Sequence, residues 1–177
     1  MKVKILGEAG GPWAREGLRL SYNQPLEKMG EVAYKLATQD DGHNKFLESI
    51  VAWLDITAPR YWWQQFDTYR IGVTKQSEST MHTILNRPLT QKDFEGDICE
   101  ETLNRLNNLI AKEDFLQLKL ELPESFLQRR IVCLNYKVLR HIIKQRKHHR
   151  LPEWPYFCYN ILDNLRYKEY LRDLVYC

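Results

Sequence analysis

The sequence predicts an α/β fold (α+β in detail), because one clear strand and several helical stretches occur in a chain of single-domain length. The strand is the stretch 50–57, where apolar residues alternate along the chain. The helices are stretches in which apolar residues recur every three or four positions. The chain has 177 residues, of which 44% are hydrophobic and 28% charged, so it can bury a core as an ordinary globular protein. We therefore expect one domain over 1–177.

Before this strand, the sequence predicts one short strand and two helices. Residues 2–6 alternate polar and apolar side chains and then meet Gly7, which is typical of a short edge strand. The stretch 13–22 is loosely helical, and 26–36 has apolar residues at helical spacing. The second helix is expected to end before a polar turn at 39–42.

The strand at 50–57 is the clearest element of the chain. Its apolar face consists of Ile50, Ala52, Leu54 and Ile56. Pro59 then suits the first turn of a helix, predicted over 60–69, because the missing N–H would have no partner there. The stretch 70–82 is polar and weakly patterned, so we expect a loop.

The rest of the chain is predicted to be mostly helical. A helix is expected at 103–110, and 122–125 interrupts the pattern with a proline. The longest apolar stripe at helical spacing runs from 131 to 143, and Leu151-Pro152 ends it. A final amphipathic helix is expected over 154–176.

The sequence favours a soluble, cytoplasmic protein. Its first residues lack the apolar run of a secretory leader, and no segment approaches the about 18 apolar residues of a membrane helix. The four cysteines are widely spaced and form no CxxC pair, which favours reduced thiols over a disulfide framework. The net charge of +3 is too small to indicate a partner, so the distribution of charge decides.

A basic segment lies between Ser125 and Pro152. It contains no Asp or Glu and eight Lys or Arg: Arg129, Arg130, Lys137, Arg140, Lys144, Arg146, Lys147 and Arg150. If acidic residues elsewhere in the fold balance them, the segment is a solvated face. Because no acidic residue lies one helical turn away, the alternative is an external anion, either a phosphate-bearing ligand or a nucleic acid backbone.

The sequence carries no signature of metal or nucleophilic catalysis. The spacing of His148 and His149 relative to Cys133 or Cys158 matches no zinc pattern, and no metal ligand is expected. There is no Gly-x-Ser-x-Gly elbow, no Cys/His signature and no phosphate-binding glycine loop. A bound nucleotide must therefore be held by side chains on helices and loops. The five Trp and ten Tyr are expected mostly to pack, with stacking on a planar ligand or a subunit contact as the alternatives.

Several segments, in order, resemble the flavin-dependent thymidylate synthases. Gly42-His43, Phe46-Leu47-Glu48 and Ala58-Pro59 are similar to the Gly-His…Phe-Glu-His…Ala-Pro entry of that family. Thr68-Tyr69-Arg70 stands where its signature RHRxxSxNExSxRY begins.

Two further stretches extend the resemblance over most of the chain. Leu122-Pro123 followed by Asn135-Tyr136-Lys137 resembles the LP…NxR stretch of the family, after which Arg146 stands where a nucleotide-binding Arg belongs. Arg19-Leu20-Ser21-Tyr22 is similar to the family's RVSF.

The resemblance implies a small twisted, mainly antiparallel sheet flanked by helices, assembled as a homotetramer with sites between subunits. It implies an FAD-dependent transferase acting on a deoxyuridine nucleotide, by reductive methylation of dUMP or a related pyrimidine modification. The further cofactors implied are NADPH and methylenetetrahydrofolate, which supplies the carbon. The difficult chemistry then belongs to the cofactors, while the protein supplies orientation and charge. We expect a divergent, phage-encoded member.

Carried over position by position, the resemblance also implies site residues. Arg146 and Gln65 are expected to be catalytic. The substrate-binding residues are expected to be Gln65, Gln76, Ser77, Ser79, Lys119 and Arg146. The FAD-binding residues are expected to be Ser21, Tyr69, Arg70, Lys75, Gln76, Asn135, Lys137, His141 and Arg150.

The signature itself is altered in this chain. Thr68 and Tyr69 replace its first Arg and its His, and Lys75 replaces its Asn. Aligned without a gap, Thr80 replaces the Arg that is the family's main clamp on the substrate phosphate. Arg87 or Lys75 is the candidate to compensate for this loss.

Two alternatives of other classes stay open. One is a non-catalytic protein that binds nucleic acid through the basic segment. The other is a degenerate family member without turnover, kept for structure or assembly.

Overall fold

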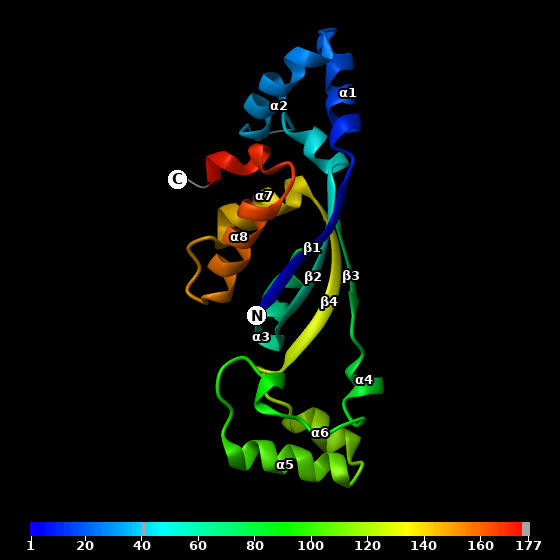
Figure 1. Cartoon of the computed structure of the whole chain (residues 1–177), viewed down its shortest axis with the longest axis vertical. Helices are drawn as coiled ribbons and strands as arrows, with labels where there is room; N and C mark the ends of the chain where they lie inside the picture. The colour runs from blue at the N-terminus through cyan, green and yellow to red at the C-terminus, as the bar shows by residue number, and fades with distance from the viewer. Residues whose placement is uncertain (40–41, 175–177) are drawn as a thin grey trace. The chain divides into compact units, whose positions relative to one another are not determined.

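The computed structural model describes residues 1–39 and 42–174 and contains one antiparallel sheet of four strands, flanked by helices. The sheet has the strand order β1-β2-β4-β3 (Figure 1). Its strands are β1 (Lys2–Ala9), β2 (Val51–Pro59), β3 (Val73–Ser77) and β4 (Leu127–Asn135). The predicted α/β class, with a mainly antiparallel sheet and flanking helices, is therefore confirmed.

The chain divides into two compact units, each of which holds a part of every strand. Unit 1 consists of Met1–Lys2, Ile56–Thr68 and Gln76–Ile131. Unit 2 consists of Val3–Asp55, Tyr69–Lys75 and Val132–Cys177. The single domain that the sequence favours stays a prediction.

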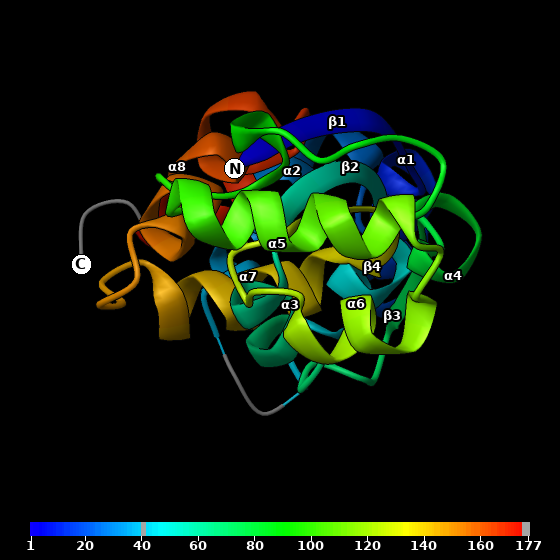
Figure 2. The ribbon, with the colours of Figure 1, turned by 90° about the horizontal axis from the view of Figure 1, so that it is seen from below.

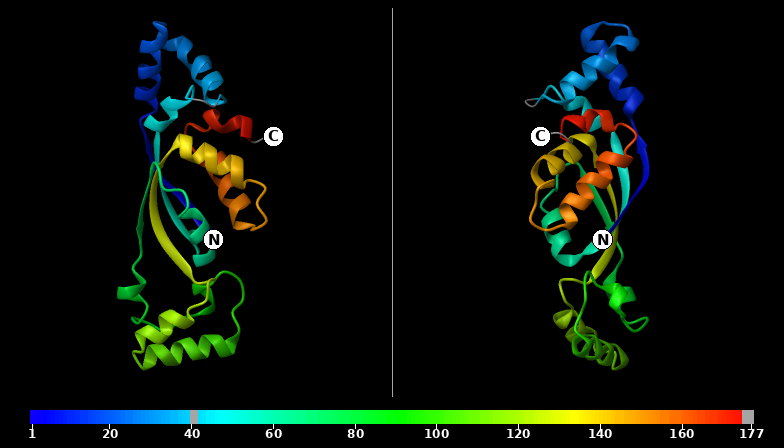
Figure 3. Two further views of the ribbon diagram at one scale, coloured as in Figure 1. Left: turned by 180° about the vertical axis from the view of Figure 1, so that it is seen from behind. Right: turned by 60° about the vertical axis from the view of Figure 1, so that its left-hand side comes forward.

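Unit 2 has a core in which strand residues and aromatic side chains are fully buried. Ala52 and Leu54 of β2 have no exposed surface, and neither have Leu139 of α7 and Trp154 of α8. The helix α8 packs against both α7 and η4, as the two views of Figure 3 show in yellow, orange and red. The helical segments of this unit are α1 (Gly11–Tyr22), η1 (Leu26–Lys28), α2 (Met29–Ala37), η2 (Lys45–Ser49), α7 (Tyr136–Arg146), α8 (Glu153–Asn164) and η4 (Lys168–Leu174).

Unit 1 has a separate apolar cluster, in which Phe126 and Phe94 meet edge to face at 5.8 Å between ring centroids. Leu106 and Leu118 are fully buried in the same cluster. They come from α5 and α6, which lie side by side in Figure 2. The helical segments of this unit are α3 (Arg60–Phe66), α4 (Thr80–Thr83), η3 (Gln91–Asp93), α5 (Glu100–Ala111) and α6 (Phe115–Glu121).

The sequence predicted the elements with a strong apolar pattern. The face of β2 formed by Ala52, Leu54 and Ile56 is fully buried, as its alternation indicated. β1 is an edge strand, three residues longer than predicted, since it continues through Gly7 to Ala9. The predicted helices at 13–22, 26–36, 60–69 and 103–110 correspond to α1, η1 with α2, α3 and α5.

The prediction of a loop over 70–82 is wrong. Val73–Ser77 forms β3, and Thr80–Thr83 forms the short helix α4. β3 is the edge strand opposite β1, and three of its five residues are exposed. An edge strand with so little buried surface needs no apolar alternation, so its sequence looks like that of a loop.

The helix predicted over 131–143 is also wrong in its first part. Residues up to Asn135 belong to β4, where Val132 and Leu134 point to the same buried face. The helix α7 begins only at Tyr136. The apolar spacing is ambiguous here, because a strand that runs directly into a helix continues the apolar pattern without a gap.

The C-terminal helix is shorter than predicted. α8 ends at Asn164, because Leu165 has extended backbone angles, and the chain continues into the 3₁₀ segment η4. Residues 175–176 of the predicted helix lie outside the described residues, as do residues 40–41 of the predicted turn. Within the described ranges, no helix is long and apolar enough to span a membrane.

Replacing Gly72 by alanine is expected to destabilise the protein by about 1–3 kcal/mol. Gly72 has a φ of +70°, and a β carbon there would lie 2.6 Å from the Asn135 side-chain nitrogen and 3.2 Å from a Val138 methyl group. The measurement is the free energy of unfolding in urea, followed by circular dichroism.

Gly17 of α1 provides the matched control. A β carbon there would meet nothing within 4 Å, and its φ lies outside the left-handed range. Gly17→Ala is therefore expected to stabilise the protein by up to about 1 kcal/mol, since alanine favours a helix interior. If Gly72→Ala were as stable as the native protein, the close approach of Gly72 to Asn135 would be unimportant.

Candidate functional site

The junction of β4 and α7 in unit 2 is fixed by Asn135. Its side-chain oxygen accepts a hydrogen bond from the Val138 N–H at 2.9 Å, which caps the first turn of α7. Its own N–H donates to the Gly72 carbonyl at 3.4 Å. Asn135 is thus a helix cap, and this role alone accounts for its side-chain oxygen.

Several cations of the basic segment have partners within unit 2. The Lys137 ammonium lies 2.5 Å from a Glu48 carboxylate oxygen. The buried Arg140 guanidinium makes two bonds of 2.5 and 2.6 Å to the Asp173 carboxylate. Acidic residues elsewhere in the fold therefore balance the charges of both Lys137 and Arg140, but Lys137 is partly exposed, as on a solvated face, whereas Arg140 is buried.

Arg146 lies at the end of α7 against two neighbouring aromatic rings, those of Tyr69 and Trp154. The guanidinium carbon is 4.9 Å from the centroid of the Trp154 ring and 5.8 Å from that of Tyr69. Nε of Arg146 donates to the Tyr69 hydroxyl at 2.9 Å, and this hydroxyl donates to the Gln145 side-chain oxygen at 2.8 Å. We call these residues, with His149, the Arg146 cluster.

The contacts of the Arg146 cluster hold a planar cation in one orientation. Trp154 is fully buried and Tyr69 is nearly so, while Arg146 itself is only half-buried. A guanidinium that is fixed in this way loses little conformational entropy when it binds an anion. The cluster can therefore present charge-assisted hydrogen bonds to a phosphate or another anionic group.

The electrostatic environment of the cluster is positive. Burial lowers the pKa of His149, and the charges of Arg146 and Arg150 lower it further. The His149 ring lies 6.3 Å from the Trp154 ring, and its Nδ1 accepts a hydrogen bond from the Leu151 N–H at 3.1 Å. The ring is therefore held in a form that accepts a proton only with difficulty.

Cys158 is not suited to be a nucleophile. It is fully buried, and this burial raises the pKa of its thiol to about 12, although Arg146 and Lys147 act in the opposite direction. A thiol of this kind remains protonated at neutral pH. Among the described residues, no group of three or more His, Cys, Asp or Glu is arranged to hold a metal ion.

The remaining FAD-binding candidates of unit 2 lie at several places. His141 has an exposed ring 6.0 Å from that of Tyr69, so it borders the Arg146 cluster. Arg70 and Arg150 are exposed, and Lys75 is half-buried on β3. Ser21 is exposed near the end of α1, a helix that packs mainly against α2 and η2.

All the substrate-binding candidates except Arg146 belong to unit 1. One of them, Gln76, is also an FAD-binding candidate. Lys119 of α6 donates to the Thr80 hydroxyl at 2.7 Å. Burial lowers the pKa of Lys119, and the charge of Arg60 adds to this. Lys119 thus lies beside Thr80, the residue that replaces the signature Arg.

The other candidates of unit 1 lie on β3 and α3 and beside α4. Gln76 and Ser77 are exposed on β3, and Ser79 is half-buried before α4. Gln65 is half-buried on α3, where its carbonyl accepts from the Thr68 hydroxyl at 2.7 Å.

Arg87 does not have the freedom that a replacement phosphate clamp requires. It makes two hydrogen bonds to the Asp93 carboxylate, at 2.5 and 2.9 Å, and a third to the Pro88 carbonyl at 2.9 Å. The Asp93 interaction raises the pKa of Arg87 and lowers that of Asp93. The suggestion that Arg87 compensates for the missing signature Arg therefore loses its support.

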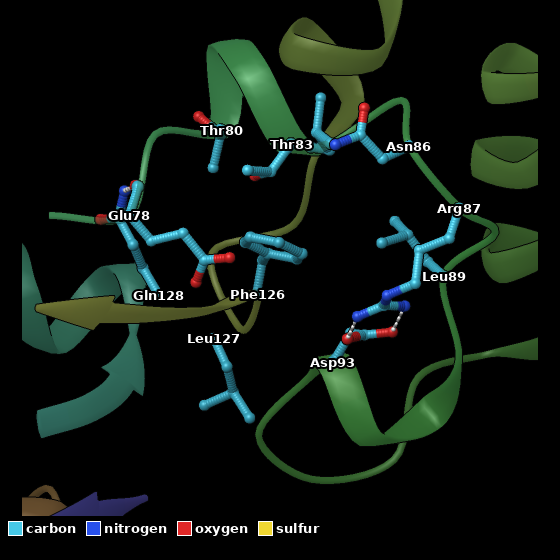
Figure 4. Close-up of a pocket in the computed structure, with 11 residues that line it drawn as sticks. Glu78, Thr80, Thr83, Asn86, Arg87, Leu89, Asp93, Phe126, Leu127 and Gln128 are labelled. Atoms are coloured by element: carbon cyan, nitrogen blue, oxygen red, sulfur yellow. Dashed lines mark hydrogen bonds and ion pairs between the residues drawn. The ribbon is translucent and has the colours of Figure 1, made fainter.

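Unit 1 also contains a pocket that the sequence did not reveal. Its volume is about 390 Å³, and it is lined on one side by Glu78 and Thr80 and on the other by Arg87 and Asp93, with Phe126 between them (Figure 4). These residues are up to about fifty positions apart in the sequence, and no motif connects them. Its lining combines polar and charged side chains with the apolar side chains of Phe126 and Leu127.

The comparisons with known proteins identify the fold. No family model matches the sequence, and no curated protein does. A crystal structure of the flavin-dependent thymidylate synthase ThyX from Helicobacter pylori, complexed with FAD and dUMP, is 18% identical to the chain and matches it with a TM-score of 0.81 over 97% of both chains. A second structure of ThyX from this bacterium, with FAD and dUMP, is 18% identical and matches with a TM-score of 0.84 over 100% of both chains. The chain therefore has a ThyX-like fold.

Acidification is expected to destabilise the protein in part through His149. Its pKa in the folded state lies below the ordinary 6.5, so the unfolded chain binds this proton more readily. The stabilisation is therefore complete above about pH 6.5 and is lost as the pH falls toward the folded pKa. In His149→Asn, whose side-chain oxygen can replace Nδ1 as an acceptor, the free energy of unfolding should fall less between about pH 7.5 and about pH 5.5.

Urea denaturation at both pH values is the measurement. His82→Asn, at an exposed position on α4, is the matched control and should keep the native pH dependence. Equal losses of stability in the native protein and in His149→Asn would contradict the assignment.

Proposed function

We propose that this chain is an FAD-dependent enzyme that acts on a deoxyuridine nucleotide, as a transferase of the flavin-dependent thymidylate synthase type. The observation that carries the proposal is the Arg146 cluster, in which Tyr69 and Trp154 hold a guanidinium at the position where the sequence resemblance implies a nucleotide-binding Arg. The ThyX-like fold over the whole chain supports it, and both ThyX structures contain FAD and dUMP.

The residues of unit 2 fit an FAD whose pyrophosphate is anionic. His141, Arg70 and Arg150 are exposed, and Lys137 has only an exposed ion pair with Glu48, which costs little to exchange for another anion. With them we assign Ser21, Tyr69, Lys75, Gln76 and Asn135 to the flavin. When bound, the flavin supplies hydride transfer, and methylenetetrahydrofolate and NADPH are the further reactants in this proposal.

The nucleotide is assigned to a second set of residues. Arg146 would bind it through charge-assisted hydrogen bonds, and Gln65 would donate or accept hydrogen bonds at the pyrimidine edge. Lys119 would contribute a cation beside Thr80, and Gln76, Ser77 and Ser79 would contribute polar groups. None of these roles requires a protein nucleophile, in agreement with the buried thiol of Cys158.

The altered signature bears on which reaction takes place. Thr80 cannot clamp a phosphate with a charge, and Lys119 carries the cation that hydrogen-bonds to it. Lysine binds phosphate as a point charge, without the bidentate geometry of arginine. We therefore include in the proposal both thymidylate synthesis and a related pyrimidine modification, the latter in a divergent enzyme of phage origin.

The proposal also includes a homotetramer. Large apolar side chains of α1 are exposed, Trp13 to 79% and Leu20 to 70%. Exposed apolar side chains of this size are typical of a surface that meets a partner.

FAD is expected to co-purify with the protein or to bind when added. The purified protein should be yellow with a flavin absorbance spectrum, and free FAD at about 100 times its Kd should stabilise the folded state by about 2.7 kcal/mol. Absorbance and thermal unfolding measure the two effects.

Two results would count against this function. A colourless protein that FAD does not stabilise would exclude a flavoenzyme. Binding of DNA by the protein without FAD, with an affinity that falls steeply as salt rises, would favour the nucleic-acid alternative. The pairing of the buried Arg140 with Asp173 argues against that alternative, because this cation is already balanced.

Arg146→Ala is expected to raise the Kd for dUMP by about 10- to 100-fold and the Kd for FAD by much less. The reason is the loss of charge-assisted hydrogen bonds to the nucleotide only. Isothermal titration calorimetry with each ligand measures both constants.

Arg146→Lys keeps the charge and should give an intermediate loss, because the planar guanidinium against the two rings is absent. Arg172→Ala, at an exposed position on η4, is the control and should bind both ligands as the native protein does. An equal loss of FAD and dUMP binding in Arg146→Ala would refute the role assigned to Arg146.

A further inference from the structure

The Gln145 side chain of the Arg146 cluster carries an inference that rests on the proposed function and deepens it. Gln145 is exposed on α7 and is not among the site residues that the resemblance implies. Its side-chain oxygen accepts a hydrogen bond from the Tyr69 hydroxyl at 2.8 Å. An exposed amide can form its hydrogen bonds with water instead, so the stability of the fold does not require this contact.

The Tyr69 hydroxyl joins Gln145 to Arg146. Its oxygen accepts from Nε of Arg146 at 2.9 Å, while its proton is donated to Gln145. A hydroxyl has one proton and two lone pairs, so a proton that points at Gln145 leaves a lone pair for the guanidinium. The three side chains therefore form one series of hydrogen bonds, in which each bond polarises and strengthens the next.

The Tyr69 ring is fixed by its neighbours, so only the hydroxyl proton can still rotate. The ring is nearly buried and lies edge to face with Trp154, at 6.2 Å between centroids, and with His141, at 6.0 Å. The acceptor oxygen of Gln145 determines where the proton points. If the proton pointed at Arg146 instead, it would meet a group without any lone pair, and the bond from Nε would be lost.

The bond from Nε determines the direction in which the Arg146 guanidinium points. The guanidinium carbon is 4.9 Å from the centroid of Trp154 and 5.8 Å from that of Tyr69. Attraction to the face of a ring tolerates rotation of the cation in its own plane, whereas a hydrogen bond does not. A guanidinium that already points in one direction loses less entropy when it binds an anion.

Tyr69 stands where the family signature has a His, so this series of bonds belongs to the altered part of the signature. An imidazole nitrogen either donates or accepts a hydrogen bond, whereas a hydroxyl oxygen does both. A hydroxyl at this position can therefore transmit an effect of Gln145 to Arg146 through a single atom.

We infer that Gln145 is a positioning residue for the nucleotide. Through the Tyr69 hydroxyl it fixes the direction in which Arg146 meets the anionic group of the nucleotide. Gln145 itself does not have to touch any ligand. Its contribution is the orientation of one proton, which requires an acceptor oxygen at this position and no charge.

Gln145→Leu removes the acceptor and is expected to raise the Kd for dUMP by about 3- to 10-fold and the Kd for FAD by less than about 2-fold. Gln145→Glu keeps an acceptor oxygen and should bind dUMP within about 3-fold of the native Kd. If position 145 acted only through charge near the nucleotide, the added carboxylate would instead make Gln145→Glu the weaker of the two variants. Isothermal titration calorimetry on the full chain measures each Kd.

A second measurement asks whether Gln145 acts through Arg146. In the Arg146→Ala background, Gln145→Leu is expected to leave the Kd for dUMP unchanged, because there is no guanidinium left to orient. Asn108→Leu, which removes an exposed amide from α5, is the matched control and should bind both ligands as the native protein does.

Three results would overturn the inference and leave the proposed function intact. They are native dUMP affinity in Gln145→Leu, weaker dUMP binding in Gln145→Glu than in Gln145→Leu, and an equal loss from Gln145→Leu with and without Arg146. A native protein that does not bind dUMP would overturn the proposed function, and the inference with it. The two failures are therefore distinguished by the native protein alone.

Discussion

The capping of α7 by Asn135 is the interaction on which the site of unit 2 depends. The bond to the Val138 N–H caps the first turn of the helix where β4 ends, and the absence of a β carbon at Gly72 leaves room for the Asn135 side chain in this position. The direction of α7 then decides where Arg146 lies, at the far end of the helix. The Arg140 pair with Asp173 holds the same helix to η4. A guanidinium packed against two rings keeps one position only if the helix that carries it is fixed, and these contacts fix the helix.

The sequence predicted the elements whose burial has a clear period. β2 could be predicted because every second residue along the strand is fully buried on one face. α5 could be predicted because its apolar residues face one cluster. β3 could not, since an exposed edge strand imposes no apolar alternation. The start of α7 could have been found from a different signal, because Asn135 precedes the helix as a capping residue and the apolar spacing alone does not mark the boundary.

The candidate site shows the same division between local and distant information. The position of Arg146 followed from the resemblance, but its partner Tyr69 is 77 residues away in the sequence. The balancing of Lys137 by Glu48 joins residues 89 positions apart, so counting acidic residues within a helical turn could not reveal it. For this reason, counting the Lys and Arg residues of the basic segment overestimates the positive charge that is available to a ligand. The pocket around Phe126 could not be predicted from the sequence at all, because the residues that line it come together only when unit 1 folds.

Lys119 illustrates how such a chain can keep a cation that folding does not favour. The ammonium is partly removed from water and lies against a neutral hydroxyl, while Arg60 adds repulsion, so at neutral pH its charge opposes the folded state. The charge of Lys119 thus lowers the stability of the folded protein but is available to bind an anion. The unfavourable free energy of burying the Lys119 charge is already part of the folded state, and a phosphate bound beside Thr80 would offset part of it. At that position, relief of the repulsion between Lys119 and Arg60 would add to the new contact with the phosphate.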